Sequence, residues 1–160
     1  MRLALLFPLL FAAAAPTAAE EAKDTNVFAH WSVPDLQSAE KELLAQKKDP
    51  ATKSLGNYGN HTTALAHRES DGKAEVHEKK NDYFVVQSGE ATLVTGGTVI
   101  DDKPGENGEH TGTGIKDGAE TVLKPGDVVH IPAGMPHQLK IKKGAAFTYF
   151  VIKVEIPAKP

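Results

Sequence analysis

The chain has 160 residues, of which 24% are charged and 40% are hydrophobic, and its formal net charge is −3. This length fits one globular domain with a buried core. The absence of cysteine excludes a disulfide scaffold, thiol catalysis and a thiolate zinc site. The mildly acidic balance and the scattered Lys and Arg residues argue against nucleic acid or an anionic membrane surface as a partner.

Residues 1–19 have the pattern of a secretory signal peptide. Arg2 precedes an apolar run over residues 3–15, and Thr17 and Ala19 suit the −3 and −1 positions of a cleavage site. This apolar run is too short to cross a bilayer core of about 30 Å. We therefore expect a periplasmic or secreted protein that begins at Glu20 and has no membrane contact after cleavage. Because Arg2 is the only charged residue removed, the mature net charge becomes −4.

Residues 20–60 are expected to form an N-terminal extension that contains one short helix. Ser32 and Asp35 make a capping box, and Pro34 is tolerated in the first helical turn. Apolar residues recur on one helical face at Leu36, Ala39, Leu43 and Leu44. We expect this helix to pack on its own domain and to end before Asp49 and Pro50, although a partner or membrane helix is also conceivable.

Residues 61–156 are predicted to form a single all-β domain of short strands separated by turn signals. The spacing is typical of an antiparallel sandwich or barrel. Residues 102–118, rich in glycine and charge, are expected to be a long surface loop, either an ordered lid or a mobile insertion. The predicted strands cover residues 62–68, 74–77, 83–87, 91–94, 98–101, 120–123, 128–131, 138–141 and 147–155.

Side chains suited to metal binding occur in two segments of this domain. Glu75 and His77 are two residues apart in a predicted strand and therefore project to the same face. Asp82 opens the following strand, and His137 follows a Pro/Gly turn at the start of another. Two carboxylates and two imidazoles suit Fe, Mn, Ni, Co or Zn as a divalent ion, and the donor set does not choose among them.

The two segments resemble the sequence motifs of the cupin family. The second cupin motif is G-x5-P-x-G-x2-H-x3-N, and GDVVHIPAGMPH over residues 126–137 matches it. The first cupin motif is G-x5-H-x-H-x3,4-E-x6-G, and EVHEKKNDYFVVQSG over residues 75–89 matches part of it. The resemblance implies a double-stranded β-helix, or jelly-roll barrel. The fixed positions that match are His77, Gly89, Gly126, Pro132, Gly134 and His137.

The first motif departs from the family at its acidic and His positions. Glu75 replaces the first His, Asp82 replaces the Glu, and Ile141 stands where the second motif has Asn. The resemblance makes His77 and His137 the expected metal ligands. Glu75 and Asp82 are chemically competent substitutes, because carboxylate oxygens bind the same ions. The alternative is a decayed site in which Glu75 and His77 form only a hydrogen-bonded pair.

Two classes of function remain open at this point. The cupin family includes metal-dependent oxygenases, isomerases, decarboxylases and lyases, so the resemblance allows an enzyme acting on a small organic molecule. Many cupins bind small ligands without turnover, so a non-catalytic binding or structural protein without metal is the alternative. A homodimer is also open, with Tyr83 and Val85 on the outer face of the sheet as its contact. His130 is expected to be a packed or surface residue rather than part of a site.

Overall fold

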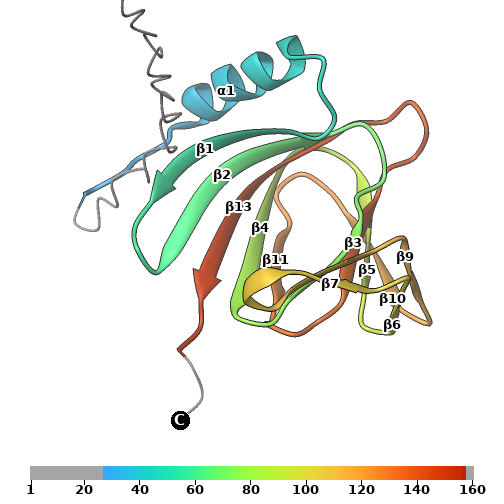
Figure 1. Cartoon of the computed structure of the whole chain (residues 1–160). Coiled ribbons are helices and arrows are strands. Elements are labelled where there is room, and N and C mark those ends of the chain that lie inside the picture. The colour runs from blue at the N-terminus through green and yellow to red at the C-terminus, as the bar shows by residue number, and fades with distance from the viewer. Residues whose placement is uncertain (1–26, 158–160) are drawn as a thin grey trace, which may run out of the picture.

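Two antiparallel sheets form the body of the protein, which the structure, a computed structural model, describes over residues 27–157. The predicted signal peptide lies outside the described residues. One sheet has the strand order β1-β2-β13-β4-β11, the other β10-β5-β12-β3-β8-β7, and β6 and β9 make a small third sheet (Figure 1). The elements are α1 (Val33–Ala45), β1 (Ala51–Asn57), β2 (His61–Arg68), β3 (Ala74–His77), β4 (Lys80–Gly89), β5 (Ala91–Thr95), β6 (Thr98–Ile100), β7 (Lys103–Pro104), η1 (Glu106–Gly108), β8 (Glu109–Gly112), β9 (Gly114–Lys116), β10 (Ala119–Leu123), β11 (Val128–Ile131), β12 (His137–Lys140) and β13 (Phe147–Glu155).

Helix α1 begins with the predicted capping box. The Ser32 hydroxyl accepts the Asp35 backbone N–H, and the Asp35 carboxylate accepts the Ser32 N–H at 2.9 Å. Leu43 is buried, and it packs with Leu65 and Phe150 on the outer face of the five-stranded sheet. Figure 1 shows the helix lying across this face. The expectation of a helix packed on its own domain is therefore confirmed.

The all-β architecture and the nine predicted strands are confirmed, with shifts of a few residues at some ends. The sequence did not predict β1, which pairs antiparallel with β2 from Ala51 onward. Its sequence, ATKSLGN, lacks a clear alternation of apolar and polar residues. Ala51 and Leu55 pack in the cluster beneath α1, but Lys53 between them pairs with Glu42 of the helix, and Thr52 lines a cavity inside the barrel.

Residues 102–118 are not a strand-free loop. They contain β7, η1, β8 and β9, and β8 extends the second sheet by pairing with β3. In this pairing Glu109 lies directly opposite His77. The insertion is therefore an ordered part of the fold, and it delivers a carboxylate to one of the predicted metal ligands.

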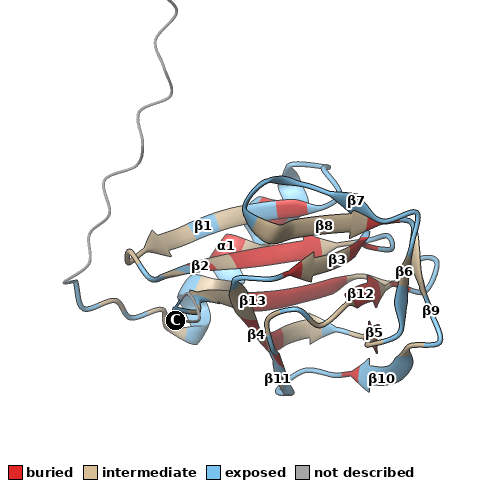
Figure 2. Ribbon diagram, turned by 60° about the horizontal axis from the view of Figure 1, so that its bottom comes forward, coloured by how far each residue is buried: buried red, intermediate tan, exposed pale blue. Residues whose placement is uncertain are grey.

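The main core lies between the two sheets. It includes Phe84, Val86, Leu139 and Ile141, which share the inward face with Asp82 and His137 as the alternation predicted. Figure 2 shows buried residues concentrated along β2, β13 and β12. On the outer face, Val85 packs against the apolar cluster beneath α1, so this part of the face is not free for a dimer contact. Within residues 27–157, no helix has the length and apolar character that a membrane span requires.

Candidate metal centre and barrel cavity

The four predicted site residues come together from three strands. Glu75 and His77 lie on β3, Asp82 on β4 and His137 on β12, where His137 is directly opposite Glu75. His77 Nε2 lies 3.8 Å from Glu75 Oε2 and 3.5 Å from Asp82 Oδ2. His137 Nε2 lies 4.0 Å and 3.9 Å from the same two oxygens. Glu75, His77 and His137 have ligand atoms within 4.8 Å of one another and could together hold a metal ion.

The orientation of His137 suits a metal ligand. Its Nδ1 is 3.1 Å from the backbone oxygen of Met135, which accepts the ring N–H. Its Nε2 then carries the lone pair, and this atom is buried without a hydrogen-bond partner in the described part of the chain. Buried polar atoms are nearly always paired, so an unpaired Nε2 facing carboxylates fits a bound cation. Burial lowers the pKa of His137, which keeps the ring neutral and able to bind a metal.

His77 is oriented by the insertion. Its Nδ1 forms a hydrogen bond with Glu109, whose other carboxylate oxygen accepts Lys80 Nζ at 2.8 Å. In the neutral ring this leaves the Nε2 lone pair facing Asp82. A carboxylate behind a His ligand fixes the tautomer and the ring orientation of that ligand. Sequence reasoning missed Glu109, because only the folded insertion places it opposite His77.

Lys153 also enters the cluster, from β13. Its Nζ donates to Asp82 Oδ2 at 2.6 Å and to His77 Nε2 at 2.8 Å. Asp82 is 2% exposed, and its second oxygen, Oδ1, has no partner in the described chain. Lys153 was also missed, although a signal existed: it has the same parity along β13 as the inward residues Tyr149 and Val151.

The site strongly favours a positive charge. Burial raises the pKa of the Asp82 carboxyl, but the adjacent His77 ring and the charge of Lys153 outweigh burial and hold the pKa below its usual value. Burial also works against a charged His77, yet Asp82 and Glu109 raise the pKa of that ring. The carboxylates therefore stabilise positive charge at His77 and at Lys153, which is the environment that a bound cation requires.

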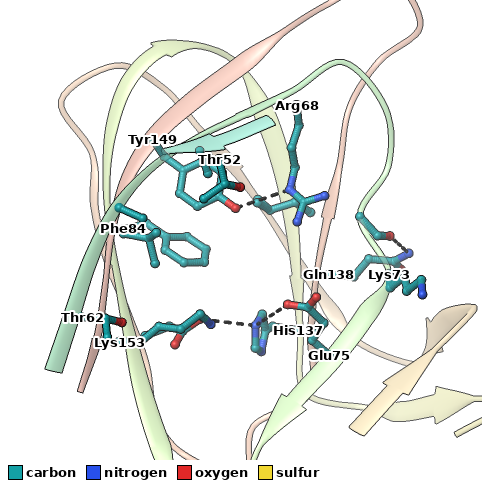
Figure 3. A pocket seen from close by; sticks show the side chains of 16 residues that line it. Thr52, Thr62, Arg68, Lys73, Glu75, Phe84, His137, Gln138, Tyr149 and Lys153 are labelled. Carbon is teal, nitrogen blue, oxygen red and sulfur yellow. Dashed lines mark hydrogen bonds and ion pairs between the residues drawn. The ribbon is translucent and has the colours of Figure 1, made fainter. Parts of the chain in front are cut away.

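The cluster lines one side of a cavity of about 220 Å³ inside the barrel. Glu75, His137 and Lys153 face the cavity from this side, while Arg68 and Tyr149 face it from the other (Figure 3). Apolar side chains fill much of the remaining wall. They are Ala64, Ala66, Phe84, Leu139 and Val151. An apolar cavity with a few convergent polar groups is the usual form of a small-molecule site.

The turns of the two motif segments support this geometry. Gly89 has a φ of +76°, and a Cβ there would lie 1.9 Å from the backbone oxygen of Ala146, so only glycine fits. Gly134, with a φ of +80°, belongs to the turn before His137. Asn81 faces away from the cluster and accepts the Ala133 N–H at 2.8 Å, which ties this turn to β4. His130 is exposed and stacks on Tyr83 with ring centroids 4.7 Å apart, as expected for a residue outside the site.

The structure is similar to several solved cupin-type structures. An uncharacterized conserved protein with a double-stranded β-helix domain from Klebsiella pneumoniae matches with a TM-score of 0.51 and 18% identity, over 71% of this chain and 83% of that one. A cupin-2 domain protein from Shewanella frigidimarina matches with a TM-score of 0.50 and 13% identity, over 73% and 92% of the two chains. A predicted oxalate decarboxylase from Thermotoga maritima matches with a TM-score of 0.50 and 12% identity, over 66% and 80%.

Comparison of the sequence with protein families and with curated proteins identifies no relative. No protein-family model matches the sequence. No curated protein matches it either. At these identities the structural similarities show the fold. Together with the two antiparallel sheets and the motif turns described above, they show that the chain has the double-stranded β-helix fold of the cupin superfamily.

Proposed function

We propose that the protein binds a divalent metal ion through Glu75, His77 and His137 and holds a small organic molecule in the adjoining barrel cavity. The observation that carries this proposal is the buried, unpaired Nε2 of His137. It lies 4.0 Å from Glu75 Oε2 and 3.9 Å from Asp82 Oδ2, too far for a hydrogen bond but close enough for both oxygens to share a cation with it. Imidazole and carboxylate together suit Fe, Mn, Ni, Co and Zn.

We also propose that residues 1–19 direct the protein to the periplasm or the exterior.

The chain's own residues divide the work of such a site. Glu75, His77 and His137 hold the ion, Glu109 orients His77, and the apolar wall around Phe84 excludes water. A divalent ion in this position supplies polarisation of a bound carbonyl or activation of a bound water. This arrangement is compatible with an enzyme and with a non-catalytic binding protein. In this proposal both would bind the metal ion.

A specific observation favours a second candidate, a metal-free binding protein. Lys153 places an ammonium group against Asp82 and His77, where it supplies positive charge to the cluster without an ion. In this candidate the cavity binds its ligand through its polar side chains, and the cluster is a hydrogen-bonded element of the fold.

Calorimetric titration of the metal-free protein with Zn²⁺ and Mn²⁺ separates the two candidates. We expect one ion to bind per chain, and we expect His137→Gln to weaken binding at least tenfold. His130→Gln is the matched control, because His130 is an exposed histidine on β11, which lies in the other sheet from His137. No ion binding by the folded wild type would support the metal-free candidate, and equal affinities of the wild type and the His137 variant would show that the ion binds elsewhere.

A further inference from the structure

We propose that the barrel cavity binds the carboxylate group of a small organic acid between Arg68 and Tyr149, on the side opposite the metal cluster. This inference rests on the proposed small-molecule function of the cavity and names the chemical class of the molecule. It is carried by a half-buried guanidinium without a counter-ion and by a buried phenol with an unused proton.

Arg68 is the inward residue at the end of β2. Thr62, Ala64, Ala66 and Arg68 alternate along this strand and all line the cavity. The only hydrogen bond of the Arg68 side chain within residues 27–157 runs from Nε to Tyr149 Oη at 3.4 Å. Among the described residues Arg68 forms no salt bridge within 4.0 Å, and Glu75 and Asp49 act on its charge only from a longer distance. Nη1 and Nη2 therefore remain available as a two-pronged donor, the geometry that binds a carboxylate bidentately.

Tyr149 adds a third donor beside Arg68. The side chain is 5% exposed, and Oη already accepts the Arg68 N–H. Burial raises the pKa of this phenol, so the hydroxyl keeps its proton. No acceptor for this O–H is present among the described residues, so a ligand oxygen near Arg68 can receive it.

The guanidinium packs against the loop before β3. It lies against the backbone of Gly72, where an added Cβ would be 3.3 Å from Nη1. Gly72 is itself held by a hydrogen bond from its N–H to the Leu139 oxygen at 2.8 Å. Burial lowers the pKa of Arg68, but Tyr149 and the charges of Glu75 and Asp49 outweigh burial and raise it, so the guanidinium stays charged. These carboxylates act at longer range than an ion pair and leave its terminal N–H groups without an acceptor, which an anion in the cavity would supply. The site is therefore built for an anion.

Size and charge select a small carboxylate. The cavity, at about 220 Å³, is smaller than the roughly 300–1,000 Å³ of sites for drug-sized ligands. Among the described cations of the lining, Arg68 alone faces inward without a salt bridge, since Lys153 is paired with Asp82 and Lys73 is exposed. One positive charge matches a carboxylate better than a phosphate dianion. A metal ion bound at Glu75 would also neutralise the negative charge of Glu75, which would otherwise repel an anionic ligand in the cavity.

The test is calorimetric titration of the full mature chain with acids and their neutral amides. The probes are acetate, malonate and succinate, paired with acetamide, malonamide and succinamide, and inorganic phosphate is included as a competing anion. We expect at least one acid to bind saturably and at least tenfold more tightly than its amide. This comparison needs no substitution, so it stands even if a variant folds poorly.

Two variants assign the binding to the proposed residues. Arg68→Gln should weaken the acid at least tenfold and Tyr149→Phe several-fold. Lys73→Gln, which removes an exposed charge at the cavity rim, should change the affinity less than twofold. The proposal is overturned if no acid binds, if an amide binds as well as its acid, if Arg68→Gln has no effect, or if phosphate binds more tightly than every acid. Metal titration of the same samples keeps the two proposals apart: acid binding through Arg68 without metal binding would contradict only the metal site.

Discussion

Lys153 Nζ and Asp82 Oδ2 are 2.6 Å apart, and the two residues are directly opposite each other in the pairing of β13 with β4. The ammonium thus lies beside the atoms that would bind a metal, and it also contacts His77 Nε2. Lys153 and a divalent ion are cations in the same small space. If the proposed metal site is correct, a bound ion would compete with Lys153 for Asp82 and His77, and we predict that it would displace the ammonium group.

Replacement of Lys153 tests this competition. Lys153→Met should raise the affinity for Zn²⁺ or Mn²⁺ at least tenfold, about 1.4 kcal/mol, because a repelling charge is removed and Asp82 becomes a free ligand. The metal-free variant should also be less stable by about 3–5 kcal/mol, the cost of leaving a buried charge unpaired, and metal should restore the stability. Titration calorimetry and thermal unfolding measure both effects.

Lys140→Met is the control for this variant, because Lys140 is a more exposed lysine whose one salt bridge within residues 27–157 is to Glu120 at 3.8 Å. It should leave the metal affinity unchanged. A Lys153→Met protein that binds metal no more tightly than the wild type would show that the ammonium and the ion do not compete.

Glu109 should influence metal binding without touching the metal. Glu109→Gln leaves the side-chain size almost unchanged but removes the charge that orients His77, so metal affinity should fall about 10–100-fold. Competition with a chromophoric chelator measures the change. Glu106→Gln, at an exposed position of the same insertion, should leave the metal affinity unchanged. If both variants lose metal affinity equally, the loss comes from the lower net negative charge and not from the orientation of His77.

The helix cap gives a prediction for stability alone. Ser32→Ala removes the acceptor for the Asp35 N–H and should lower the free energy of unfolding by about 1 kcal/mol. Chemical denaturation measures this loss, and Ser38→Ala, an exposed position inside the helix, should cause none. An unchanged midpoint for Ser32→Ala would mean that the cap does not stabilise α1.

The signal peptide is tested by expression in a Gram-negative host. The proposed cleavage predicts a periplasmic product whose N-terminal sequence begins at Glu20, and Ala19→Arg should block processing because a small residue is needed at the −1 position. Mass spectrometry of the periplasmic and cytoplasmic fractions reads both results. A wild-type product that retains Met1 in the cytoplasm would contradict the proposal.

The sequence predicted the parts of this molecule that depend on local patterns. Strand alternation placed Asp82, Phe84 and His137 on one face, and the Ser32–Asp35 box marked the start of the helix. The motif spacing brought Glu75, His77 and His137 into one cluster. These features could be predicted because residues close in sequence determine them.

The remaining features depend on contacts between distant segments. Glu109 meets His77 only because β8 pairs with β3, and no local pattern in the glycine-rich insertion indicates that register. Lys153 reaches Asp82 across a strand pair that joins residues 71 positions apart. Arg68 had a local signal, since it continues the inward alternation of Ala64 and Ala66, but its role depends on Tyr149 from β13.

The most direct test of the central claim is anomalous diffraction from crystals grown with Zn²⁺ and measured at its absorption edge. We predict one strong peak about 2.0–2.2 Å from Nε2 of His77, Nε2 of His137 and a carboxylate oxygen of Glu75, with Lys153 Nζ moved away from His77. The account would be contradicted if the only peaks lay at surface residues and the Lys153 contacts with Asp82 and His77 were unchanged.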